Sequence, residues 1–136
     1  MFVKQLSIFV ENKTGRIQSI IDTLSENGIN ISALSIAATT DFGIVRMIVD
    51  TPDKAREALR EIGVISKCTD VISVYIDDKT GGLAEVLKVV SSEGIGIEYM
   101  YAYLGRVEGK AVMVIKADNP EKAVEALKAD GIEIAE

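Results

Sequence analysis

Two short segments of the chain hold polar and glycine residues at a spacing that could bind a small charged ligand. In the first, residues 12–17, an asparagine precedes a glycine by three residues just before an apolar helix pattern begins. The first N–H groups of a helix have no partner within it and carry partial positive charge, which suits a carboxylate. The carbonyl oxygen of Asn12 can accept from an ammonium. The junction therefore fits both ends of an α-amino acid; the alternative is an ordinary turn, in which Gly15 relieves backbone strain.

The same pattern returns 66 residues further along, so the chain contains an internal repeat. Residues 12–15 read NKTG and residues 78–81 read DKTG. Two further blocks match: residues 28–31 with 94–97 under the same shift, and residues 50–55 with 118–123 under a shift of 68. A period this long indicates small domains rather than a solenoid. The sequence therefore predicts two tandem units, residues 1–66 and residues 67–136.

The first part of each unit has the signature of a strand, a helix and a hairpin. In the first unit, alternating apolar residues predict a strand over residues 6–10, and apolar residues at helical spacing predict a helix over residues 17–24. Two segments rich in β-branched residues follow, residues 29–38 and 43–50, with a polar turn between them. Their adjacency predicts a β-hairpin.

A second helix and a short last strand complete each unit. Thr51–Pro52 and Asn119–Pro120 each place a capping side chain before a proline suited to the first helical position. Gly63 predicts the end of the first of these helices, and Val64–Ile65 the strand after it. The order is βαββαβ, which folds most simply as a four-stranded antiparallel sheet with both helices on one face. We therefore predict two ferredoxin-like units of the α+β class.

In such a unit the sheet face away from the helices has no cover of its own. The alternating set Tyr99, Tyr101 and Tyr103 is expected on that face or at its edge. Ordinary strand packing is one interpretation, and a subunit interface, where tyrosine is enriched, is the other. We favour the interface and expect a homodimer.

Composition excludes several classes of protein. The 136 residues include 15 Lys and Arg, 21 Asp and Glu, one cysteine and no histidine, for a net charge of −6. Without histidine the usual general base and the commonest metal ligand are missing, and the single Cys68 permits neither a disulfide within the chain nor a thiolate zinc site. The acidic balance disfavours nucleic acid as a partner. No apolar stretch reaches the roughly 18 residues of a membrane helix, so we expect a cytoplasmic protein with no membrane contact.

Enzymatic chemistry finds little support in the remaining motifs. Asp77 and Asp78 are adjacent, so on a strand end they point to opposite sides and are expected to be solvated turn charges. No phosphate-binding loop is present, because Gly81–Gly82 lacks the lysine–serine ending that such loops carry. Arg16 is expected to be an exposed cation at a helix start.

The duplicated βαββαβ unit resembles the ACT domain, a small regulatory module that binds amino acids. The resemblance rests on Asn12 and Gly15 after the first strand and on Gly28-Ile29-Asn30-Ile31 entering the second, and it covers nearly the whole chain as two copies. Leu6-Ser7-Ile8, Glu11-Asn12, Asn30-Ile31 and Arg46-Met47 of the first copy are also similar to the regulatory subunit of acetolactate synthase.

The resemblance also implies a site. In serine-binding members of the family the effector lies between two ACT domains, held by an amide of the strand-one loop and a second amide entering strand two. By motif and spacing those positions are Asn12 and Asn30. The second copy departs with Asp78 and Gly96. Asp78 could pair with an ammonium but would repel a nearby carboxylate.

These observations predict a non-catalytic regulatory protein, without cofactor or metal, that senses a free amino acid at interfaces between ACT-like units. The alternative is a regulatory subunit that docks to a biosynthetic enzyme such as acetolactate synthase. The candidate ligand-binding residues are Asn12, Lys13, Thr14, Gly15, Arg16, Ile17, Asn30 and Ile31 in the first unit, and Asp78, Lys79, Thr80, Gly81, Gly82 and Leu83 in the second.

Overall fold

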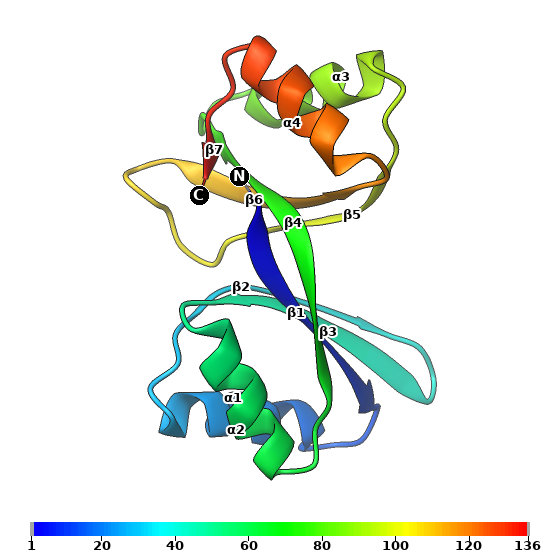
Figure 1. Ribbon diagram of the computed structural model, residues 1–136, viewed down its shortest axis with the longest axis vertical. Coiled ribbons are helices and arrows are strands. Elements are labelled where there is room, and N and C mark those ends of the chain that lie inside the picture. The colour runs from blue at the N-terminus through cyan, green and yellow to red at the C-terminus, as the bar shows by residue number, and fades with distance from the viewer. Residues whose placement is uncertain (1, 136) are drawn as a thin grey trace. The chain divides into compact units, whose positions relative to one another are not determined.

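The computed structural model describes residues 2–135, which form two compact units (Figure 1). The amino-terminal unit is Lys4–Thr69. The carboxy-terminal unit consists of residues 70–135 together with residues 2–3. The predicted boundary between residues 66 and 67 falls inside a strand that begins in the first unit and ends in the second.

The amino-terminal unit contains two helices, two complete strands and parts of two others. Its elements are β1 (Val3–Glu11), α1 (Arg16–Glu26), β2 (Ile31–Ala38), β3 (Phe42–Val49), α2 (Pro52–Glu61) and the beginning of β4 (Ser66–Ile76). β3 pairs antiparallel with β1 on one side and with β2 on the other. Because β1 and β2 each oppose β3, they run parallel to each other.

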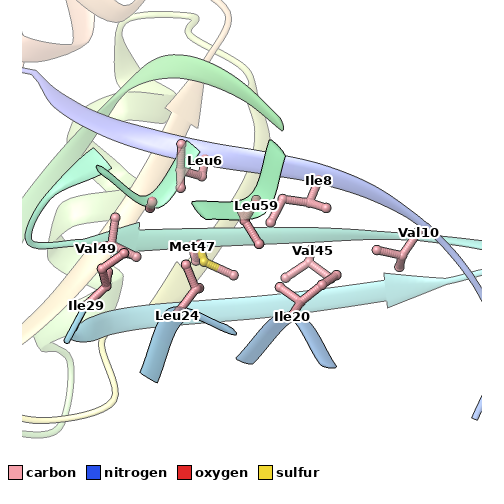
Figure 2. Packing of buried hydrophobic residues seen from close by; sticks show 11 residues of the cluster. Leu6, Ile8, Val10, Ile20, Leu24, Ile29, Val45, Met47, Val49 and Leu59 are labelled. Carbon is pink, nitrogen blue, oxygen red and sulfur yellow. The ribbon is translucent and has the colours of Figure 1, made fainter. Parts of the chain in front are cut away.

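The core of this unit lies between the sheet and its two helices (Figure 2). The alternation predicted for the first strand is confirmed, since Leu6 and Ile8 are fully buried. The remaining apolar residues of the cluster come from β1, from β3, from both helices and from the entry to β2: Val10, Val45, Met47, Val49, Ile20, Leu24, Ile29, Ala55 and Leu59.

The carboxy-terminal unit repeats this arrangement. After β4 it contains α3 (Gly82–Ser92), β5 (Ile97–Ala102), β6 (Ala111–Ala117), α4 (Pro120–Ala129) and β7 (Ile134–Ala135). β6 pairs antiparallel with β4 and β5, and β7 pairs antiparallel with β4. Both units are therefore ferredoxin-like folds of the α+β class, as predicted.

The last strand of the amino-terminal unit differs from the prediction. Val64 and Ile65 are not in a strand, and β4 begins at Ser66. The reason lies at the end of α2, where Gly63 has φ +79° and the N–H of Val64 donates to Leu59 O at 2.9 Å. This Schellman closure uses the Val64 donor, so the chain extends only after it. Residues 66–76 contain no glycine or proline and continue as one strand.

The two predicted helix caps also behave differently. The Asn119 side chain accepts from the N–H of Lys122 at 3.2 Å and caps α4 as predicted. Thr51 does not cap α2, because its hydroxyl donates to Asp50 Oδ1 at 3.1 Å instead. The prediction for Thr51 is therefore wrong.

Candidate functional site

The junction between β1 and α1 has a conformation that only glycine adopts easily. Gly15 lies at φ +88° and ψ −11° immediately before α1, and no side chain caps the helix. At the equivalent junction of the second unit, Gly81 lies at φ +88° and ψ −6°. The glycines of the two motifs therefore serve the same backbone turn. Neither helix has a side-chain cap, but the N–H of Arg16 donates to Lys13 O at 3.2 Å and that of Gly82 to Lys79 O at 3.0 Å.

The predicted site residues gather at three places. Residues 12–16 are exposed and Ile17 is half-buried against the core. Asn30 is exposed just before β2, and Ile31 begins that strand. Residues 78–83 surround the start of α3, and all are exposed except Gly82. Gly82 is buried because a Cβ there would lie 2.2 Å from Asp77 O.

Hydrogen bonds of Asn12 connect the β1–α1 junction to the turn between β2 and β3. Its backbone N–H donates to Asp41 O at 2.8 Å, and its side-chain Nδ2 donates to Thr39 O at 3.1 Å. The amide donor is thus in use, and the side-chain oxygen Oδ1 is the group suited to accept from a ligand.

Asp78 occupies the equivalent position in the second unit but has a different partner. Its carboxylate forms an ion pair with the guanidinium of Arg106, and both side chains are more than half exposed. Arg106 lies in the β5–β6 connection, as Thr39 lies in the β2–β3 turn. The two junctions are therefore held by different chemistry: amide to backbone in one, carboxylate to guanidinium in the other.

Asn30 and Asn12 do not meet within one unit. Asn30 precedes β2, and its N–H donates to Asp50 Oδ1 at 3.2 Å. Asn12 lies beside the turn at the other end of β2, which has eight residues. At about 3.3 Å per residue, the two asparagines are roughly 25 Å apart along the strands. A ligand the size of an amino acid therefore cannot contact both side chains within one unit.

The backbone around position 30 is alike in both units. The N–H of Gly96 donates to Asp118 Oδ2 at 3.1 Å, as that of Asn30 donates to Asp50. A Cβ on Gly96 would lie 2.8 Å from the same carboxylate oxygen. The second unit thus keeps the hydrogen bond from the backbone N–H at this position to an aspartate, but Gly96 has no side-chain amide with which to bind a ligand.

Charges at the first junction are arranged around Glu11. Lys13 Nζ lies 2.9 Å from Glu11 Oε2. The hydrogen bond and charge of Lys13, with a smaller effect of the Arg16 charge, lower the pKa of Glu11 below 4.5. Glu11 is therefore ionised throughout the neutral range.

A cavity of about 470 Å³ lies beside this junction, and the sequence patterns did not predict it. It is lined by the end of β1, the first turns of α1, Phe42 and residues 62–65. Arg16 is the one predicted site residue that lines it, while Asn12 and Asn30 do not. A phenylalanine at an outward-facing position of β1, Phe9, is the sequence feature that could have indicated this cavity.

The tyrosines of β5 lie on the sheet face away from the helices. Tyr99 and Tyr101 stack with their ring centroids 6.5 Å apart, and Tyr101 is 8% exposed. The hydroxyls of Tyr103 and Ser73 lie 3.2 Å apart in a hydrogen bond. Their proposed role in a subunit interface stays a prediction.

Two further observations concern the described residues only. They contain no group of three or more potential metal-ligating side chains placed to hold an ion. None of their helices is long and apolar enough to cross a membrane.

Comparison with known proteins identifies the family. Residues 1–136 match the family of ACT domain pairs, and the chain belongs to this family. The acetolactate synthase small subunit of Buchnera aphidicola subsp. Baizongia pistaciae (strain Bp) is 30% identical over 87 residues, which cover 62% of this chain and 54% of that relative. The resemblance to ACT domains is confirmed.

Solved structures agree with the fold. Protein BT0572 from Bacteroides thetaiotaomicron is 42% identical with a TM-score of 0.92, over 99% of this chain and 92% of that one. The ligand-free regulatory subunit of aspartate kinase from Thermus thermophilus is 20% identical with a TM-score of 0.65, over 93% and 91% of the two chains. The second similarity concerns the fold alone.

Proposed function

We propose that this ACT domain pair is a non-catalytic regulatory protein that binds a free amino acid at an interface between two ACT units. The observation that carries the proposal is the β1–α1 junction, where an uncapped helix start lies beside Asn12. The helix N–H groups suit the ligand carboxylate, and Asn12 Oδ1 suits its ammonium.

The separation of the two asparagines supports an interface site. Asn12 of one unit and Asn30 of another could hold one ligand together, whereas a single unit could not. Binding would then stabilise the assembly of units, because a ligand stabilises whichever state it binds. A change in amino-acid concentration would thereby change the protein's assembly or the state of a partner enzyme.

Charge favours the amino-terminal unit as the place of binding. Residues 1–66 carry 7 basic and 8 acidic side chains, a net charge of −1, while residues 67–136 carry 8 and 13, a net charge of −5. An anionic carboxylate is repelled less by the first set, although salt reduces the difference beyond about 8 Å.

A thermal-shift screen of the twenty amino acids on the full chain tests the proposal. A ligand at 100 times its dissociation constant stabilises the folded state by about 2.7 kcal/mol, which gives a readily measured shift. We expect at least one amino acid to raise the melting temperature in a concentration-dependent way. The absence of any shift at millimolar concentrations would contradict amino-acid sensing.

The second candidate function is that of a regulatory subunit docked to a biosynthetic enzyme. It is favoured by the similarity to an acetolactate synthase small subunit over 62% of this chain. Copurification from the native cell decides between the two. Recovery of a catalytic subunit in stoichiometric amount would support docking, and recovery of the chain alone would support free sensing.

A further inference from the structure

The cavity beside the first junction has the size of a small-molecule site. Its volume of about 470 Å³ lies within the roughly 300–1,000 Å³ typical of ligand pockets. The end of β1 lies on one side, the first turns of α1 on a second, and residues 62–65 on a third. All of its lining residues belong to the amino-terminal unit.

One wall of the cavity is formed by the segment that follows α2. The hydrogen bond from Val64 N–H to Leu59 O turns the chain back toward the helix, and β4 begins only at Ser66. The end of β1 therefore borders an irregular segment there. Apolar side chains at the cavity are left open to solvent: Ile65 is 85% exposed, Phe9 70% and Phe42 60%. An apolar ligand body would remove part of this surface from water, which is favourable.

One cation at the cavity makes no direct ion pair among the described residues, although its charge acts on the Glu11 carboxylate, which also lines the cavity. Arg16, the first residue of α1, forms no ion pair or side-chain hydrogen bond with any residue between 2 and 135, and the first turn of α1 contains no acidic residue. A guanidinium beside a helix start is a strong carboxylate-binding combination. Glu11 on the other side of the junction is ionised and paired with Lys13, so an ammonium would also meet a favourable charge.

The equivalent surface of the second unit has none of these properties. Gly82 stands in place of Arg16, and Glu85 places an acid in the first turn of α3. Glu133 stands in place of Ile65, where its side chain pairs with Lys110 at 3.1 Å and its carbonyl accepts from Tyr75 N–H at 2.9 Å. The combination of an unpaired arginine with exposed apolar side chains thus belongs to the first unit.

We infer that this cavity binds an α-amino acid with a bulky aliphatic or aromatic side chain. The Arg16 guanidinium binds the carboxylate, and the side chain packs among Phe9, Phe42, Ile62 and Ile65. This inference rests on the proposed amino-acid sensing for the ligand's identity, but it places the side-chain pocket away from Asn12 and Asn30. The chemistry recognised is a carboxylate on an apolar body, which the 2-oxo acid of the same carbon skeleton shares.

Calorimetric titration of the full chain with leucine and phenylalanine tests this inference, with aspartate and serine as polar comparisons. Arg16→Gln removes the guanidinium that would bind the ligand carboxylate. Lys54→Gln, at an exposed position of α2, is the control that removes the same charge elsewhere. Ile65→Glu introduces the residue found at the equivalent position of the second unit, and Leu104→Glu is the control at another largely exposed apolar side chain. We expect roughly tenfold to hundredfold weaker binding of the apolar amino acid in both cavity variants and unchanged binding in both controls.

The possible results of this titration test the cavity site and the proposed amino-acid sensing separately. Binding of leucine or phenylalanine that neither cavity variant changes would overturn the inference and leave amino-acid sensing standing. Binding of aspartate or serine alone would overturn the apolar ligand class. Binding of 4-methyl-2-oxopentanoate that requires Arg16, without binding of leucine, would support the carboxylate pocket and overturn amino-acid sensing. No binding of any of these carboxylates would overturn the inference, and amino-acid sensing would then depend on the screen of all twenty amino acids.

Discussion

At the scale of single residues, Asn12 and Asp78 occupy equivalent positions in the two units but bind different partners. Both lie at the same turn before a glycine of nearly identical conformation. The side-chain Nδ2 of Asn12 donates to the β2–β3 turn, and its Oδ1 can accept a hydrogen bond from a ligand. The Asp78 carboxylate instead forms an ion pair with Arg106. The two units should therefore differ in ligand binding.

We expect Asn12→Ala to weaken amino-acid binding by about 1–3 kcal/mol, because a charged ligand group would lose a hydrogen bond. Asp78→Ala should change affinity less, since its carboxylate already has a partner. Calorimetric titration of both variants measures the difference, with melting temperatures recorded to confirm folding. Unchanged affinity in Asn12→Ala together with lost binding in Asp78→Ala would assign the working site to the second unit.

The lowered pKa of Glu11 gives a pH-dependent prediction. Because the folded-state pKa lies below 4.5, the Glu11–Lys13 pair contributes stability above that pH, and the contribution is lost as pH falls through the folded-state value. Lys13→Ala should move the Glu11 pKa back toward 4.5. Carboxyl chemical shifts followed by NMR during an acid titration measure this, and Lys54→Ala should leave the Glu11 titration unchanged.

At the scale of elements, the helix starts after Thr51 and Asn119 form a matched pair. Only Asn119 caps its helix, so Asn119→Ala should lower the free energy of unfolding by about 1 kcal/mol. Thr51→Ala removes an exposed hydroxyl that bonds Asp50, so its effect should be within about 0.5 kcal/mol. Urea unfolding of both variants measures this, and equal losses would contradict the assignment of the cap.

The order of elements could be predicted because it depends on local periodicity. Leu6 and Ile8 alternate as a half-buried strand should, and Gly15 marks the turn in both motif and structure. The start of β4 could not be predicted, because it depends on which carbonyl takes the Val64 donor. The cavity was missed for a related reason, since it joins β1 to residues about 55 positions away. Arg16 is exposed, as predicted, and its place beside the cavity is a tertiary property.

At the scale of the whole molecule, we expect each unit to be marginal alone. A unit of about 65 residues buries only about 60% of the surface that its unfolded chain exposes. A fragment of residues 1–66 also ends at the first residue of β4. It should be unstable or self-associate, as circular dichroism melting and sedimentation would report. A monomeric fragment with a cooperative melt would contradict mutual support between the units.

We also expect the full chain to form a dimer. Asn12 and Asn30 are too far apart in one unit to hold one ligand, and closed two-fold assemblies are the commonest among soluble oligomers. Sedimentation velocity at micromolar concentration should show a species heavier than 14.7 kDa. A 14.7 kDa species alone, with or without ligand, would contradict this expectation.

The ion pair between Arg106 and Asp78 has a consequence for competition. A group tethered by a short flexible connection acts on its neighbour at an effective concentration of about a millimolar. A free ammonium at micromolar concentration would have to displace that guanidinium from the Asp78 carboxylate. Arg106 therefore competes with a ligand ammonium for the Asp78 carboxylate of the second unit. Arg106→Ala would leave the Asp78 carboxylate without this partner and free to pair with an ammonium in solution.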